Sequence, residues 1–66
     1  MRQTDFWERM NTVFGQAYAS SVATDQVISQ LGDRTIKAAL ADGVDVHTVW
    51  RAVCSQYADR VPARLR

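Results

Sequence analysis

The side chains best equipped for chemistry in this chain are its single histidine, His47, and its single cysteine, Cys54. The seven-residue spacing puts both along one edge of a helix, and an imidazole and a thiolate are both zinc ligands. A structural zinc site needs four ligands, which only a dimer pooling two such pairs would supply. We therefore expect no metal site, a partly exposed His47, and a Cys54 that acts as a small buried apolar residue.

Nucleophilic catalysis needs a base next to the nucleophile and a third group that orients the base. Nothing in the sequence marks a third group for His47 and Cys54. The carboxylates Asp5, Asp25 and Asp45 stand at expected helix starts, where a capping role accounts for them. The three glycines are isolated and form no phosphate-binding run. We expect no catalytic residue, no cofactor and no enzymatic activity.

Two tryptophans stand close to arginines, a combination suited to binding a partner protein. Trp7 precedes Arg9 by two positions, and Trp50 is followed directly by Arg51. Tryptophan and arginine are enriched at energetically important interface positions, although tryptophans in so short a chain more often belong to the core. Trp7, Arg9, Trp50 and Arg51 are therefore the candidate residues for an unidentified protein partner, with core packing of both tryptophans as the alternative.

Residues 39–54, ALADGVDVHTVWRAVC, have the spacing of a DNA-reading helix-turn-helix, with a small residue, the turn glycine Gly43 and buried apolar positions. In that motif the second helix would have to expose Val46 and Trp50, which belong to its apolar side. Nucleic-acid binding is therefore the second-ranked hypothesis. The candidate nucleic-acid-binding residues are Arg34, Lys37, His47, Arg51, Arg60, Arg64 and Arg66.

Helical periodicity defines the elements that must position these side chains. The expected helices cover residues 5–14, capped by Thr4 or Asp5, and residues 17–31, which are either buried on two sides or broken at Thr24 and Asp25. Two more cover residues 35–42 and a last stretch from Asp45 to before Pro62. Asp5 and Glu8 form the expected capping box of the first helix. In the last helix the apolar residues repeat at helical spacing, which is the strongest such signal in the chain. They are Val46, Val49, Trp50, Val53, Cys54 and Tyr57.

The chain has 66 residues, of which 47% are hydrophobic, and a single proline. This composition favours one ordered domain, and no alternation of period two predicts a strand. We expect an all-α fold with three to four short helices in a compact domain over residues 1–58, followed by a basic, flexible tail over residues 59–66. The lone cysteine and the lack of an apolar leader or span predict a cytoplasmic protein without membrane contact. A monomer and a homodimer formed through the last helix both remain open.

Several blocks of sequence occur together in the order MRQTDFWERM, FGQAYA, LGDRT, ALADGV and VWRAVC. In these blocks the chain resembles a family of very short actinobacterial proteins known only as a domain of unknown function. The resemblance runs from Met1 to about Cys54, and the family has glycine in place of Asp33. It implies no activity, cofactor or catalytic residue. Members are often encoded beside the recombinase RecA and the regulator RecX, which implies by association a link to DNA repair or its control.

Overall fold

The computed structural model describes residues 1–66 and contains four α-helices, one two-stranded antiparallel sheet and two short 3₁₀ helices. The elements are α1 (Gln3–Phe14), α2 (Gln16–Asp25), β1 (Val27–Ile28), η1 (Ser29–Leu31), β2 (Arg34–Thr35), α3 (Ile36–Ala41), α4 (Val46–Gln56) and η2 (Ala63–Leu65). The mainly helical single domain confirms the expected fold class. The expectation that no strand forms is wrong for the four residues of β1 and β2.

Helix α1 begins at Gln3, two residues before the expected start. The backbone N–H of Arg2 donates a 3.1 Å hydrogen bond to Oδ2 of Asp5, which satisfies a donor at the start of the helix. This bond is the main reason that the pKa of Asp5 lies below its ordinary value. The capping interaction therefore runs from Arg2 to Asp5, and the predicted pairing of Asp5 with Glu8 is wrong.

The second predicted helix ends at Asp25, at the predicted break, and a hairpin follows instead of a new helix. Val27 pairs with Thr35 and Ile28 with Arg34 across the two short strands. β-branched residues favour extended backbone, which explains why the helix is not resumed. The turn contains Gly32 and Asp33, both with positive φ, at 73° and 59°.

The predicted caps of the last two helices are present. Thr35 Oγ1 accepts a 3.1 Å hydrogen bond from the backbone N–H of Ala38 at the start of α3. Asp45 Oδ2 accepts bonds of 3.0 Å and 3.2 Å from the backbone N–H groups of His47 and Thr48 at the start of α4. These side chains satisfy donors that a helix leaves unpaired in its first turn.

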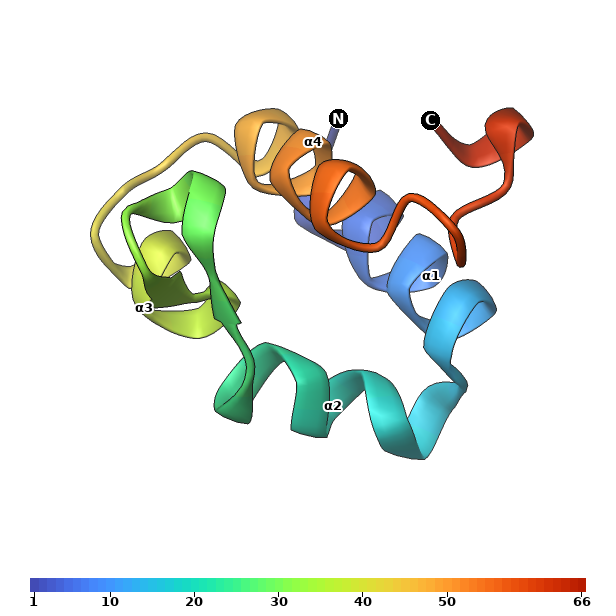
Figure 1. Ribbon diagram of the computed structural model, residues 1–66, viewed down its shortest axis with the longest axis horizontal. Helices are drawn as coiled ribbons and strands as arrows, with labels where there is room; N and C mark the ends of the chain where they lie inside the picture. Colours follow the sequence, from blue (N-terminus) through green and yellow to red (C-terminus); the bar gives the residue numbers. More distant parts are fainter.

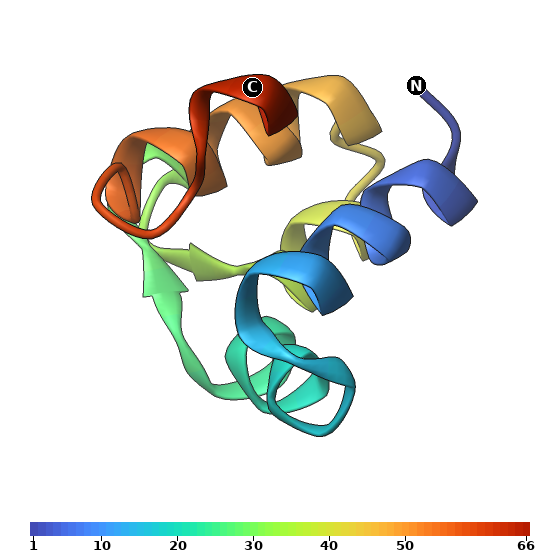
Figure 2. The same cartoon turned by 90° about the vertical axis from the view of Figure 1, so that its right-hand side faces the viewer.

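Helices α1 and α4 run side by side in the same direction, as Figure 2 shows. The ring of Phe6 lies edge-on to Trp50 with centroids 5.9 Å apart, and further along Phe14 meets Tyr57 at 5.2 Å. In Figure 1, α4 and the C-terminal segment form the upper part of the molecule and α2 the lower part. α3 packs against both α2 and α4 and closes the remaining side. None of the helices combines the length and apolarity needed to cross a bilayer.

The core is entirely apolar and draws on every α-helix. It consists of Phe6, Met10, Phe14, Ala19, Val22, Ala23, Ile28, Leu31, Ile36, Ala39, Val49, Trp50, Ala52, Val53 and Val61. The presence of Val61, which is only 2% exposed, shows that the core extends past the last α-helix.

The segment 59–66 folds back over α4 and α1, so the prediction of a separate tail is wrong. Val61 is buried, Leu65 packs against the core, and η2 lies beside α4 in Figure 2. The side chain of Arg66 donates to the carbonyl oxygens of Ala58 and Val61, at 2.6 Å and 3.2 Å. These bonds satisfy carbonyls near the end of α4 and hold the segment in place.

Candidate interaction surfaces

Trp50 is a core residue, so its predicted role as a partner-binding residue is wrong. Its side chain is fully buried, and its indole Nε1–H donates a 2.8 Å hydrogen bond to the carbonyl oxygen of Leu65. The C-terminal segment therefore covers the side of α4 that would have presented this indole. A buried tryptophan needs a partner for its N–H, and the backbone of the covering segment supplies one.

The two arginines that flank the tryptophans differ in their surroundings. Arg9 is half-buried, with its guanidinium carbon 5.9 Å from the ring centroid of Trp50 and its Nη1 3.5 Å from the carbonyl oxygen of Leu65. Arg9 is thus engaged within the domain, contrary to its predicted role. Arg51 is exposed on the side of α4 opposite the buried Val53. Of these two side chains, Arg51 is the one that remains free for a partner.

Trp7 is half-buried and remains accessible to solvent. Its ring lies edge-on to Phe6 with centroids 5.1 Å apart and an interplanar angle of 81°. Because Phe6 also contacts Trp50, the exposed indole rests on a chain of packed aromatic rings. The structure therefore separates the two tryptophans that the sequence treats alike, with Trp50 inside and Trp7 at the rim.

The corner between α3 and α4 has the buried positions of a helix-turn-helix but not its reading face. Ala39 and Val49 are fully buried, and Gly43 turns the chain with a φ of 87°. The reading face would need Trp50 at its centre, and that side of α4 is covered. The predicted inward orientation of the tryptophan-bearing stripe is confirmed, although the buried face is wider and also includes Ala52.

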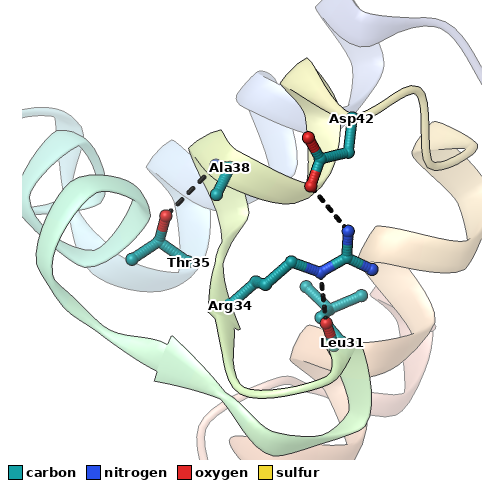
Figure 3. A network of polar contacts seen from close by, with 5 residues as sticks. All are labelled: Leu31, Arg34, Thr35, Ala38 and Asp42. Atoms are coloured by element: carbon teal, nitrogen blue, oxygen red, sulfur yellow. Dashed lines mark hydrogen bonds and ion pairs between the residues drawn. The ribbon is translucent and has the colours of Figure 1, made fainter.

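Arg34, a candidate for phosphate contact, is committed to the fold (Figure 3). Its Nε donates a 2.7 Å hydrogen bond to the carbonyl oxygen of Leu31, and its Nη1 lies 2.7 Å from Oδ2 of Asp42. The side chain thus ties the hairpin turn to the end of α3. Lys37, on the same helix, is exposed and takes part in no ion pair.

The arginines of the C-terminal segment are exposed and pair with no carboxylate. Arg60 lies over the ring of Phe14, with its guanidinium carbon 5.2 Å from the ring centroid. Arg66 holds backbone carbonyls, as described above, while Arg64 makes no hydrogen bond to the domain. The outward face of α4 adds Arg51 to this group.

His47 and Cys54 are not arranged as a catalytic pair. The rise of 1.5 Å per helical residue places them about 10 Å apart along the axis of α4, beyond the reach of a hydrogen bond. His47 is exposed, and Cys54 is half-buried. Burial raises the pKa of the Cys54 thiol, an effect partly offset by the positive charges of Arg66 and Arg9. The thiol is therefore protonated at neutral pH.

No three His, Cys, Asp or Glu side chains lie close enough together to hold a metal ion.

The sequence alone does not reveal the role of the C-terminal segment, because Pro62 and four nearby charged residues give it the appearance of a solvated end. The signal that would have found it is the spacing of Val61 and Leu65, four residues apart and able to face one way.

The protein is thus a small helical domain with the half-buried Trp7 on α1 and unpaired arginines on α4 and the C-terminal segment. Residues 1–64 match the model of a family described as a protein of unknown function, DUF3046, and the chain belongs to this family. The match includes most of the C-terminal segment, which the resemblance noted above did not cover. Comparisons with curated proteins and with solved structures gave no match.

Proposed function

We propose that this domain is a non-enzymatic protein-interaction module that binds a partner protein at the end of the molecule carrying Trp7. The observation that carries the proposal is the state of Trp7: half-exposed, yet fixed edge-on against Phe6. A rigid, partly exposed indole loses little conformational freedom on binding, which is why tryptophan is frequent among binding hot spots.

Other apolar side chains are left partly open to solvent as well. Because α1 and α4 run in the same direction, the start of α4, which is Val46, lies at the same end of the helix pair as the start of α1 (Figure 2). Leu40 near the end of α3 and Val44 in the turn before α4 are both half-buried, and Met1 is exposed just before α1. We call Met1, Trp7, Leu40, Val44 and Val46 the Trp7 end. A partly exposed apolar surface of this kind can bind an apolar side chain of a partner protein.

The apolar stripe of α4, which includes Trp50 and Val53, contributes little to a partner-binding surface. Trp50 and Val53 are fully buried within the chain, so self-association through this stripe would require the domain to open. The proposal therefore keeps the part of the predicted partner surface that carries Trp7 on α1, drops the part that carries Trp50 on α4, and adds the α3–α4 turn. The proposal includes a cytoplasmic location for the domain and its partner, as the sequence leads us to expect.

The test is affinity capture from the native cell after nuclease treatment, comparing the wild-type domain with Trp7→Ala. The matched control is Tyr18→Ala, which removes an aromatic side chain that is 53% exposed on α2. Trp7→Ala is expected to lose the captured protein and Tyr18→Ala to retain it, with circular dichroism checking the fold of both. Equal capture by all three forms would reject the Trp7 end as the binding surface.

A second measurement covers the case in which Trp7→Ala unfolds the domain. In a Trp50→Phe background Trp7 is the only tryptophan, and binding of a purified partner should shift its emission to the blue and protect it from iodide. An emission spectrum unchanged by a partner that demonstrably binds would place the interface elsewhere.

A further inference from the structure

The arginines around α4 form a surface distinct from the Trp7 end. From Val46 to the last residue described, the chain has four arginines and one acidic side chain, Asp59. The two ion pairs of the domain lie elsewhere, between Arg2 and Asp5 and between Arg34 and Asp42. The positive charges of this region are therefore not neutralised within the domain.

The remaining side chains on the outward face of α4 are hydrogen-bond donors. Thr48, Arg51 and Ser55 follow each other at intervals of three and four residues, share one face, and are all exposed. Between its cap Asp45 and Asp59, the helix has no carboxylate. Guanidinium and hydroxyl groups are the usual donors to phosphate oxygens in protein–nucleic acid contacts.

Positive charge is distributed unevenly in space as well as in sequence. Figure 1 places α4 and the C-terminal segment on one side of the molecule and α2 on the other. α2 contains no lysine or arginine and ends at Asp25. In the electric field of a polyanion, this uneven distribution of positive charge would turn the domain so that α4 and the C-terminal segment face the polyanion.

We infer that the outward face of α4, with Thr48, Arg51 and Ser55, and the C-terminal segment, with the arginines Arg60 and Arg64, bind the phosphate backbone of nucleic acid without reading its sequence. This surface has no apolar anchor, because the C-terminal segment covers Trp50. A protein interface normally requires such an anchor, whereas phosphate binding is driven by charge and counterion release. The buried reading face of α4 leaves Arg51 as the only strong base-contacting group and makes the binding independent of sequence.

The experiment is fluorescence anisotropy of short labelled duplexes of two unrelated sequences, titrated with the full chain. Three phosphate contacts predict that affinity falls roughly 40-fold between about 50 mM and about 200 mM salt, equally for both duplexes. Arg51→Gln and Arg64→Gln are each expected to weaken binding about five- to tenfold at the lower salt and to reduce the salt slope by about one. Lys37→Gln, which removes one charge from α3, is the matched control and should change affinity less than about twofold.

Three results would overturn the inference. One is the absence of any anisotropy change at the lower salt concentration, and another is a Lys37→Gln effect as large as that of Arg51→Gln. The third is displacement of the duplex by polyglutamate at equal charge concentration, which would indicate an acidic protein as the ligand. Trp7→Ala should leave the anisotropy titration unchanged, so this result is independent of the protein-binding proposal.

Discussion

The indole N–H of Trp50 and the carbonyl oxygen of Leu65 are joined by a 2.8 Å hydrogen bond across fifteen residues of sequence. Because Trp50 also packs edge-on against Phe6, the bond links the C-terminal segment to both α4 and α1. It explains why a tryptophan beside an arginine is not at the surface, and it makes the C-terminal segment a stabilising part of the domain.

Deleting residues 62–66 should therefore destabilise the domain. The deletion removes the packing of Leu65 and leaves the indole N–H of Trp50 without its partner, a loss of roughly 2 to 4 kcal/mol in the free energy of unfolding. Urea denaturation measures this loss. In a Trp7→Phe background, the emission of Trp50 should also shift to the red and become accessible to iodide. An unchanged unfolding midpoint would mean that the segment does not hold Trp50 in solution.

Asp33 should be sensitive to substitution because it is the only non-glycine residue with positive φ, at 59°. Asp33→Ala is expected to cost about 1 kcal/mol, since alanine tolerates the left-handed conformation less well than aspartate. Asp33→Gly should be at least as stable as the wild type, because glycine adopts this conformation freely. Asp25→Ala, at an exposed position with ordinary backbone geometry, is the control for loss of a carboxylate. Equal thermal midpoints for Asp33→Ala and Asp33→Gly would contradict the expectation.

The pairing of Arg34 with Asp42 should contribute modestly to stability. Their side chains are 39% and 56% exposed, so solvent screens the 2.7 Å ion pair, and a double-mutant cycle should give a coupling of about 0.5 to 1 kcal/mol. Arg34→Ala should cost more than Asp42→Ala, because it also removes the hydrogen bond to the carbonyl oxygen of Leu31. Denaturation of the four cycle members provides the measurement, and equal costs for the two single substitutions would count against this assignment.

Cys54 should react slowly with alkylating reagents at neutral pH. Burial raises the pKa of its thiol above the ordinary value of 9.0, so little thiolate is present. The reaction with iodoacetamide should accelerate only in strongly alkaline buffer, and urea should bring its pH midpoint back toward 9.0. Because the pKa is higher in the folded state, this group's contribution to stability is fully present below the unfolded pKa and is lost as pH rises through the folded one. A fast reaction at neutral pH would show that the thiol is more open than the structure indicates.

Arg66→Gln is expected to slow this alkylation further. The positive charge of Arg66 lowers the pKa of Cys54 and so opposes the larger effect of burial. Removing the charge should move the pH midpoint of alkylation upward, provided that the segment stays folded. Lys37→Gln is the matched control and should leave the midpoint in place. A downward shift would indicate that the substitution had exposed the thiol.

The sequence predicts those parts of the fold that local rules determine. The caps Thr35 and Asp45, the end of α2 at Asp25 and the inward face of α4 follow from side-chain hydrogen bonding and helical spacing, and the structure has all three. The start of α1 was misplaced because Asp5 can cap a helix either as its first flanking residue or from the third position. The position of Asp5 in the sequence is compatible with both roles, and only the three-dimensional structure distinguishes them.

The candidate sites depended on long-range packing and were predictable only in part. Trp7 and Trp50 have similar sequence surroundings, and what separates them is the arrival of Leu65 over one of them. Arg34 and Arg51 likewise differ only because Asp42 and the Leu31 carbonyl lie within reach of the first. Such differences arise from the path of the chain in space, which the periodicity of single elements does not encode.

The contacts of Phe6 with Trp50 and of Trp50 with Leu65 also bear on how the domain forms during synthesis. The first helix to leave the ribosome can pack against α2 at once, but the part of its inner face that contacts α4 and the C-terminal segment stays uncovered until the other end of the domain has followed. A nascent chain halted before residue 65 would leave its aromatic side chains exposed to chaperones and proteases. The domain is thus expected to mature in one step after its last turn emerges, with no stable amino-terminal half.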